Sequence, residues 1–560
     1  MNKDGIILII MSLLLFSCTQ TKEYITLLDN IKLQKKKNPP ITYRNDWQHK
    51  DIIEDTIPGI SLDKAYRELL KDKKGKTVVV AIIDTEMDIF HEDLKDAIWI
   101  NPNEIPDNGI DDDDNGYIDD IHGWNFLGNQ QGGNIIYSNL ESTRIIRKFQ
   151  SQFQNVKQED VLEQDIEDFL QYQKALIHYK ENYDKLIEEK KYGVFLTEGY
   201  KKSVNTLSKF FPEQNYTLSK LDSIYALYKE NKEYSADIYY MKDYIKYNLS
   251  AEWISNYNKD IDEKIATILN DNYEDRKIQG DDPKDLSDIH YGNNNVFKNA
   301  AIFNHSTKVA GLIAATRNNE LGIKGVTNNV TLMALCVKAY SSEHDKDVAL
   351  AIRYAVDNGA QIINISLGKR QSLHPDWIQG AIRYAAEHDV LIVCAAGNES
   401  TDLDGITLYP NDEKHDGTEI SHNFIKVGSI SYYINEWFVS YFSNYGKGNV
   451  DVFAPGHDLF TTIANNKYEF DSGTSLSAPI VSGVAALIRS YYPTLTAAEV
   501  KSIILESGIS YDIMVNRPAE NGSNDKIHFS ELSKSGKVVN AYNALLMAKE
   551  GAKKKKKKKR

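Results

Sequence analysis

Six short runs of almost uninterrupted apolar residues constrain the fold of this chain more than any other feature. They lie at residues 78–84, 330–337, 361–367, 390–398, 424–430 and 450–455. Strands that are apolar on both faces need cover on both sides, which is the situation of parallel sheets. Helical patterns at 346–359 and 377–389 separate several of the runs. This alternation predicts an α/β fold with a doubly wound, mostly parallel sheet.

Residues 135–288 interrupt this pattern. They are rich in Lys, Glu, Asp, Gln and Tyr and contain no run of the buried-strand type. Helical spacing joins a set of apolar residues there, Leu162, Ile166, Phe169, Leu176, Tyr183 and Ile187, and a second helical zone covers 216–270. The segment is therefore predicted to be a helical insertion subdomain whose apolar stripes pack against one another.

Composition excludes several classes of protein. With 560 residues, 41% hydrophobic and 26% charged, the chain is not a small disulfide scaffold, a collagen-like repeat or a polytopic membrane protein. Its net charge is −14, and because the last eight residues carry +8, the rest carries −22. Such an acidic body disfavours a nucleic-acid partner, which needs clustered cations. Three cysteines give no disulfide framework, and Cys336 and Cys394 are expected to be buried strand residues.

The N-terminus has the pattern of an export signal. Residues 6–16 are apolar but too short to span a bilayer comfortably, and Ser17 and Cys18 follow them. This resembles the lipobox of bacterial lipoproteins, in which the cysteine is lipidated. The resemblance implies a signal peptide at 1–18, a leader at 19–45, and an exported protein anchored to a membrane of the cell envelope through lipidated Cys18, facing the periplasm or the cell surface. The alternative is an ordinary signal peptide or a short anchor.

Four polar residues stand in contexts that suit nucleophilic catalysis. Asp84 ends an apolar run, His305 begins the helical pattern HSTKVAGLIAA, and Asn398 ends another run. Ser475 lies in GTSLSAP, just before an apolar helix whose first turn admits a proline. A serine hydroxyl needs a base, histidine titrates near neutrality, and a carboxylate fixes the histidine tautomer. An amide at a strand end can donate to a developing oxyanion.

In this order and context the four residues resemble the subtilisin-like serine peptidases (the subtilase or S8 family), over about residues 50–128 and 290–548. The resemblance implies a subtilisin-like sheet, with Asp84 orienting His305 as general base and Ser475 as nucleophile. Asn398 would donate to the oxyanion together with the backbone N–H of Ser475. No catalytic metal or organic cofactor is implied.

The resemblance also assigns substrate contacts, to Ser366, Leu367 and Gly368 as a substrate-pairing edge, and to Ala395, Ala396 and Gly397 as the other wall of the pocket. Protein or peptide substrates and endopeptidase action through an acyl-enzyme follow. Two alternatives stay open, namely a catalytically silent surface-binding protein that uses the insertion, and an esterase on the same residues. The oligomeric state is not predicted.

Three positions depart from the family pattern. Glu86 stands where the family usually has glycine, and Ser306 replaces a glycine after the histidine. Lys308 adds a cation one turn from His305, where it is expected to lower the pKa of the imidazole.

An acidic loop at 107–120, DNGIDDDDNGYIDD, suits a hard cation. Its candidate ligands are Asp111, Asp113, Asn115 and Asp119 at positions 1, 3, 5 and 9 of a calcium-loop pattern, with the carbonyl of Tyr117. Position 12 is His122, so a complete EF-hand is excluded. The loop predicts a structural Ca²⁺ site, and the alternative is an acidic surface loop without metal.

The remaining boundaries follow from these assignments. Residues 46–134 and 289–550 are predicted to form the two parts of a peptidase core, and 551–560 a basic tail. The lysine run of the tail predicts disorder. A solvated tail and attraction to an anionic membrane surface are the two readings of its charge.

Overall fold

The computed structural model describes residues 27–28, 45–414, 417–519 and 525–558. The predicted signal peptide, Cys18 and most of the leader lie outside these residues. Within them, no helix combines the length and the apolar character needed to cross a membrane.

A seven-stranded sheet forms the centre of the fold, with strand order β3-β4-β2-β5-β6-β7-β8, and every pairing in it is parallel. Its strands are β2 (Val78–Asp84), β3 (Gly123–Asn125), β4 (Val330–Cys336), β5 (Ile362–Ile365), β6 (Leu391–Ala395), β7 (Phe424–Ile430) and β8 (Val452–Pro455). All six apolar runs are strands of this sheet, which confirms the predicted α/β class. The short edge strand β3 was not predicted, because three residues are too few to show a periodicity.

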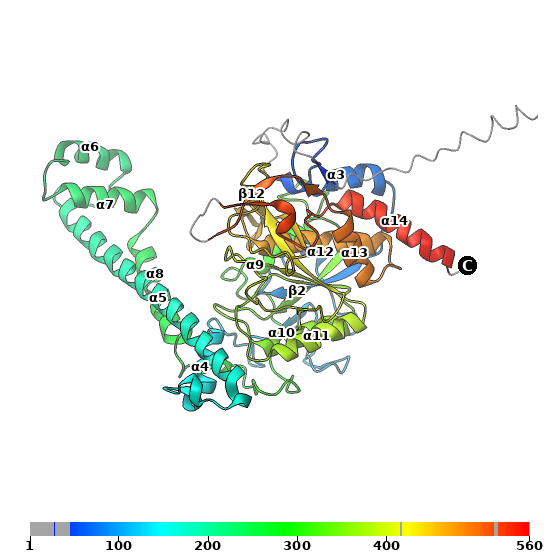
Figure 1. Cartoon of the computed structure of the whole chain (residues 1–560). Coiled ribbons are helices and arrows are strands. Elements are labelled where there is room, and N and C mark those ends of the chain that lie inside the picture. Colours follow the sequence, from blue (N-terminus) through cyan, green and yellow to red (C-terminus); the bar gives the residue numbers. More distant parts are fainter. Residues whose placement is uncertain (1–26, 29–44, 415–416, 520–524, 559–560) are drawn as a thin grey trace, which may run out of the picture.

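Helices cover both faces of the sheet. One apolar cluster joins Val80 and Ile82 of β2 to α9 (His305–Ala314) and α12 (Thr474–Tyr491). The alternate residues Ala81 and Ile83 point to a second cluster with α10 (Asp345–Asp357) and α11 (Pro375–Glu387). Figure 1 shows α10 and α11 below the sheet and α12 above it. Successive side chains of a strand point to opposite faces, so one apolar run fills both layers.

Smaller elements complete the body of the molecule. An antiparallel hairpin, β9 (Leu459–Ile463) and β10 (Lys467–Asp471), packs β9 against α9. The others are α3 (Leu62–Ala65) with the π-turn Tyr66–Leu70, α13 (Ala497–Ser507), β1 (Leu27–Leu28) paired with β11 (Ser510–Tyr511), β12 (Met514–Asn516) paired with β13 (Lys526–His528), and α14 (Ala541–Lys558).

The predicted disorder of the basic tail is wrong as far as Lys558. Helix α14 runs through the lysines up to that residue and packs against α13. Lys555 donates to the carbonyl of Thr494 at 2.9 Å and pairs with Glu499. Lysine is a good helix former, and cations are favourable near a helix C-terminus, so the tail extends a helix that is already anchored.

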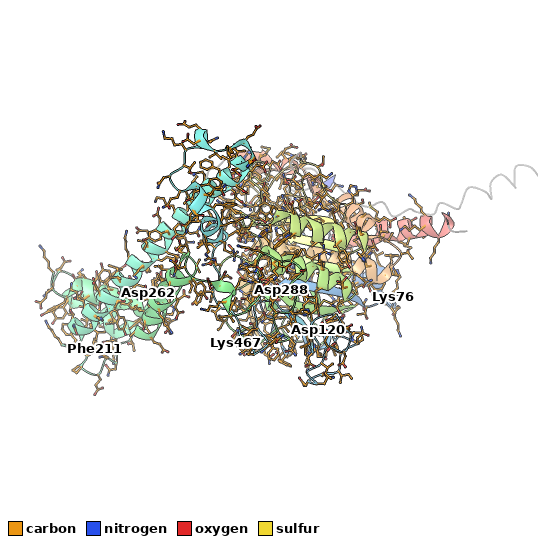
Figure 2. The ribbon with its side chains drawn as sticks, turned by 90° about the horizontal axis from the view of Figure 1, so that it is seen from below. Lys76, Asp120, Phe211, Asp262, Asp288 and Lys467 are labelled. Carbon is orange, nitrogen blue, oxygen red and sulfur yellow. The ribbon has the colours of Figure 1, made fainter. Side chains whose placement is uncertain are left out.

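Five helices between β3 and α9 form an arm that projects from the body. They are α4 (Glu141–Phe153), α5 (Ile166–Leu207), α6 (Leu218–Tyr228), α7 (Ser235–Lys246) and α8 (Ala251–Thr267). Helix α5 has 42 residues, about 60 Å at 1.5 Å per residue. Figure 1 shows α6 and α7 at the far end of the arm, and Figure 2, seen from below, places Phe211 there.

The apolar stripe predicted along the arm is only partly buried. Phe169 packs with Phe149 and Phe153 of α4 at the root of the arm. Leu162 precedes α5 and is exposed, and the exposed fractions of Leu176 and Tyr183 are 37% and 42%. The prediction that these three residues are packed is wrong. Leu162 lies outside α5, and Leu176 and Tyr183 lie on a stretch of α5 that packs against α8, where two helices alone bury little surface.

Candidate active site

The predicted catalytic residues meet at the carboxyl edge of the sheet. A pocket of about 440 Å³ is lined by Asp84, His305, Asn398 and Ser475, together with the predicted substrate residues Ser366, Leu367, Gly368, Ala395 and Gly397. Ala396 does not line this pocket, so its predicted substrate contact is wrong. Its side chain is fully buried with Leu403, Leu408 and Val450, because successive residues after β6 alternate in direction.

Asp84 and His305 form a close pair. The imidazole Nδ1 lies 2.7 Å from Oδ1 and 3.0 Å from Oδ2 of the carboxylate, which is 1% exposed. The backbone N–H of Thr85 also donates to Oδ1 at 2.7 Å. An Nδ1–H donated to Asp84 leaves the lone pair of a neutral imidazole on Nε2, the nitrogen that a base uses.

The electrostatics of His305 follow from the same pair. Burial lowers the pKa of the imidazole, but the charge and hydrogen bond of Asp84 outweigh burial, and the net pKa is raised above its ordinary value. The ring is still 34% exposed, so it remains accessible from the pocket.

Ser475 is held at the start of α12 by hydrogen bonds to two strand ends. The hydroxyl of Ser366 donates to the Ser475 carbonyl at 2.8 Å. The neighbouring Thr474 donates to Oδ1 of Asn398 from its N–H at 2.8 Å and from its hydroxyl at 3.0 Å. The Thr474 hydroxyl in turn accepts from Gly397 N–H at 3.0 Å. The sequence therefore places the nucleophile by bonds to its neighbour and to its own backbone, leaving the hydroxyl for the pocket.

Asn398 is oriented by these contacts. Because its amide oxygen accepts from Thr474, its NH₂ group is the part available to donate elsewhere. A Cβ added to Gly473 would lie 2.9 Å from Oγ of Ser475 and 3.6 Å from Nδ2 of Asn398. Oγ of Ser475 and Nδ2 of Asn398 therefore lie on either side of the same small space, next to the positive N-terminal end of α12.

The first two departures from the family pattern have structural partners. Glu86 is buried and accepts from the side-chain amides of Asn134 at 3.0 Å and Asn299 at 2.9 Å, and from the Asn299 backbone. The N–H of Ser306 donates to the Thr85 hydroxyl at 3.0 Å. Both contacts attach the segment around His305 to the end of β2, and neither Glu86 nor Ser306 lines the pocket.

Lys308, the third departure, lowers the pKa of His305 as expected, but the net pKa of the imidazole is still raised. Its ammonium pairs with Glu469 and Asp471 of β10, each at 2.6 Å. Lys308 itself lowers the pKa of the imidazole, but Asp471 raises it and Asp84 raises it more. The expected effect of the lysine is therefore present, but the carboxylates of Asp84 and Asp471 together outweigh it. Asp471 comes from 163 residues further along the chain, so spacing near His305 gives no sign of it.

Some residues that line the pocket were not predicted from the sequence. Residues 338–341, after β4, line the pocket together with Leu408. The Leu408 methyl Cδ2 would lie 2.9 Å from a Cβ on Gly397 and 3.4 Å from one on Gly368. Leu408 therefore lies between the two predicted walls and limits the room there. No pattern in its loop marks it in the sequence.

The acidic loop brings together a different set of residues from the predicted one. Ligand oxygens of Glu104, Asp111 and Asp113 lie within 4.8 Å of one another. The predicted ligand Asp119 is not one of these three residues, and its carboxylate accepts from the backbone N–H groups of Asn108 and Gly109 at 3.1 and 2.8 Å. Glu104 precedes the loop and carries no spacing signal.

The other two predicted ligands are engaged locally. The amide oxygen of Asn115 accepts from Tyr117 N–H at 2.8 Å, and its NH₂ donates to Asp120 at 3.1 Å. The Tyr117 ring is buried against Trp124 and Tyr354, with centroids 5.1 and 4.9 Å away. Trp124, which follows the loop, and Tyr354 of α10 therefore pack the loop onto the body.

Comparisons with known proteins agree with this geometry. The family model described as "Subtilase family" matches residues 75–527. A "Thermophilic serine proteinase" of Bacillus sp. (strain AK1) is 39% identical over 188 residues, 33% of this chain and 43% of that protein. "Thermitase" of Thermoactinomyces vulgaris is 35% identical over 187 residues, 33% of this chain and 61% of that protein. The chain spans about half the length of the curated relatives that it matches.

Two solved structures also match part of the chain. One, of proteases from Pseudoalteromonas arctica, is 28% identical with a TM-score of 0.35, covering 44% of this chain and 70% of that chain. A "cold adapted subtilisin-like serine proteinase" is 26% identical with a TM-score of 0.31, covering 40% and 73% of the two chains.

The role of Lys308 can be measured directly. Lys308→Met removes a cation that lowers the pKa of His305 and leaves the Asp471 carboxylate, which raises it, without that cation. We expect the pKa of His305 to rise further, so that the neutral imidazole appears only at higher pH. An NMR titration of the imidazole nitrogens measures this. Lys467→Met, an exposed lysine on the same hairpin, is the control and should change the pKa less. An unchanged or lower pKa in Lys308→Met would contradict the prediction.

Proposed function

Because the chain belongs to the subtilase family, we propose that it is a serine endopeptidase, with Asp84, His305 and Ser475 as its catalytic triad. The observation that carries the proposal is the pocket in which a carboxylate-bound histidine, a serine at a helix N-terminus and an oriented amide donor line one surface.

Each residue has a defined role in the reaction. Nε2 of His305 takes the proton of the Ser475 hydroxyl as Oγ bonds to the substrate carbonyl carbon. Asp84 holds the imidazole by Nδ1–H and stabilises the imidazolium. The negative charge that develops on the carbonyl oxygen receives hydrogen bonds from Asn398 and the N–H of Ser475. The imidazolium then protonates the leaving amine, and water repeats the sequence on the acyl-enzyme.

The substrate is proposed to be an extended peptide. The segment 338–341 lies on one side of the pocket and Ser366–Gly368 on the other. A peptide strand between them would use main-chain hydrogen bonds for affinity and few side-chain contacts for selectivity. Protein substrates with modest sequence preference follow from this.

Labelling with a fluorophosphonate probe tests the proposed function. The probe phosphonylates an activated serine Oγ: an O–P bond forms, the P–F bond breaks and fluoride leaves. The unmutated protein should therefore be labelled and Ser475→Ala should not. Peptide hydrolysis should fall about 10³-fold or more in the same variant. Ser477→Ala is the matched control, because this serine is fully buried and donates to the Ala454 carbonyl at 3.2 Å.

Two outcomes would redirect the assignment. A folded protein that is never labelled would contradict an enzyme and favour the catalytically silent binding protein. Labelling with ester hydrolysis but no peptide hydrolysis would favour the esterase.

The chain organisation is part of the proposal. We propose a peptidase core of residues 46–134 and 289–550, with 135–288 inserted in it. We also propose an exported lipoprotein anchored to a membrane through Cys18, supported by the apolar stretch at 6–16 that ends just before this cysteine. Mass spectrometry of the mature N-terminal peptide tests the anchor, and an unlipidated Cys18 would contradict it.

A structural calcium ion is proposed at Glu104, Asp111 and Asp113. Oε2 of Glu104 and Oδ1 of Asp113 are buried and have no hydrogen-bond partner among the described residues. Burial raises the pKa of Glu104, and Asp113 and Asp120 add to this. Hard carboxylate oxygens that lack partners suit Ca²⁺, which would neutralise them and fix the loop.

Thermal unfolding tests the calcium site. At a free Ca²⁺ concentration about 100 times the Kd, binding to the folded state alone stabilises it by about 2.7 kcal/mol. We therefore expect Ca²⁺ to raise the Tm and a chelator to lower it. Asp113→Asn should abolish the shift. The neighbouring Asp114→Asn, at an exposed position outside the cluster, should keep it. A Tm independent of Ca²⁺ would exclude the site.

A further inference from the structure

The pocket wall formed by residues 338–341 contains a residue with a strained backbone. Ser341 has a φ of +92°, an unusual value for a residue other than glycine, and it lines the pocket. Such backbone conformations persist only where the surroundings over-determine them, and they concentrate at functional sites. The contacts that hold this segment therefore matter for the pocket.

The root of the arm supplies main-chain contacts to the wall. The Tyr340 N–H donates to the Ile136 carbonyl at 2.9 Å, and the Ser138 N–H donates to the Tyr340 carbonyl at 3.0 Å. The rings of Tyr137 and Tyr340 stack with centroids 5.3 Å apart. Ala339 and Ser341, the residues on either side of Tyr340, both line the pocket.

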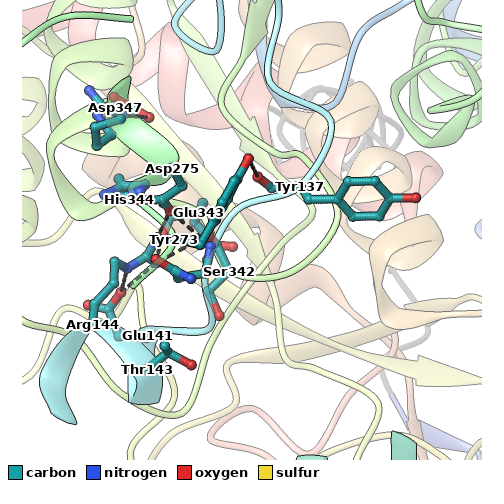
Figure 3. Close-up of polar contacts among 12 residues, drawn as sticks. Tyr137, Glu141, Thr143, Arg144, Tyr273, Asp275, Ser342, Glu343, His344 and Asp347 are labelled. Atoms are coloured by element: carbon teal, nitrogen blue, oxygen red, sulfur yellow. Dashed lines mark hydrogen bonds and ion pairs between the residues drawn. The ribbon is translucent and has the colours of Figure 1, made fainter. Parts of the chain in front are cut away.

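Arg144 of α4 holds the segment just after the strained residue. Its guanidinium donates to the carbonyls of Ser342 at 3.2 Å and Glu343 at 2.9 Å. The side chain is 6% exposed, and its charge is balanced by Glu141 at 2.6 Å and Asp275 at 3.3 Å. Figure 3 shows these groups around the one arginine. Only a guanidinium has enough donors in a fixed plane to bind two carbonyls and two carboxylates at once.

Asp275 also links the segment after the wall to the segment before α4. Nε2 of His344 lies 2.9 Å from Oδ2 of Asp275, which also accepts from the Asn139 N–H at 2.9 Å. Within the wall, Lys338 pairs with Glu343 at 2.7 Å. The wall is thus attached to α4, to the segment before it and to the chain that returns from the arm.

From this geometry we infer that the root of the arm, residues 136–144, positions the substrate-facing wall at Ser341 for binding extended peptides, with Arg144 as the positioning residue. The inference rests on the proposed peptidase function. It gives the root of the arm a role in substrate binding, although none of the residues proposed to be catalytic belongs to this segment.

Substrate length separates positioning from chemistry. Acetyl-tetra-alanine 4-nitroanilide reaches along the wall, whereas acetyl-alanine 4-nitroanilide and a fluorophosphonate occupy only the reacting end of the pocket. In Arg144→Lys we expect the KM for the long substrate to rise about tenfold. The kcat/KM for the short substrate and the rate of labelling should stay within about twofold of the unmutated protein.

Two further variants give the experiment its controls. Arg147 lies one turn away on α4, and its guanidinium donates to Asn139, Asp271 and Tyr273 but not to the wall. Arg147→Lys should therefore raise the KM for the long substrate less than Arg144→Lys does. Ser341→Gly removes the strain, because glycine adopts positive φ freely. Added to Arg144→Lys, it should restore part of the affinity for the long substrate.

The outcomes are distinct. Three outcomes with normal labelling would overturn the inference. They are an equal loss of kcat/KM on both substrates in Arg144→Lys, the same kinetics in Arg144→Lys as in Arg147→Lys, and no recovery of the KM when Ser341→Gly is added. Absence of labelling in the unmutated protein would overturn the proposed function and this inference with it. If Arg144→Lys does not fold, Tyr137→Ala, which removes the ring stacked on Tyr340 from a half-buried position, takes its place with the same expected split.

Discussion

The register of four parallel strands is the constraint on which the site depends. Asp84 at the end of β2 pairs with Cys336 of β4, Ile83 with Ile365 of β5, and Ile365 with Cys394 of β6. The residues that follow each strand therefore leave the sheet at the same edge, which is where ligands bind in open α/β sheets. A shift of one residue in any pairing would exchange the side chains that the strand gives to the two apolar layers. The register is therefore fixed by how the side chains of each layer fit the helices that cover it. The packing of the core therefore also fixes the relative positions of the pocket residues at this edge of the sheet.

Charge balance is the second requirement of this edge. The pair of Asp84 and His305 gains from partial burial, which strengthens their attraction but would penalise an unpaired charge. Lys308 lies close enough to disturb the pair, and Glu469 and Asp471 compensate it from the hairpin. The buried carboxylate of Glu86 is satisfied by amides of Asn134 and Asn299. Departures from a family pattern near a catalytic residue are thus tolerated when new partners take up their charge.

The arm contributes contacts to the pocket although most of it lies outside the body. Its far end lies well away from the body, as Figures 1 and 2 show, whereas its root is joined to the pocket wall by main-chain bonds and by Arg144. The strain at Ser341 is a local cost that the contacts of Arg144 and Tyr137 offset. A member of the subtilase family built in this way can change the wall of its pocket without changing Asp84, His305 or Ser475.

The sequence by itself determined the parallel α/β sheet and the four residues Asp84, His305, Asn398 and Ser475 that meet in the pocket. It also determined five more residues that line this pocket, namely Ser366, Leu367, Gly368, Ala395 and Gly397. The apolar runs and the GTSLSAP motif are each made of neighbouring residues, so they can be recognised in the sequence alone. Tertiary structure alone decided the partners of Lys308, the place of Glu104 in the acidic cluster, the position of Leu408 between two walls, and the attachment of the wall at Ser341 to Arg144. Each of these joins segments far apart in the chain, and the strength of an electrostatic or packing contact depends on distance in space, which spacing along the chain does not encode.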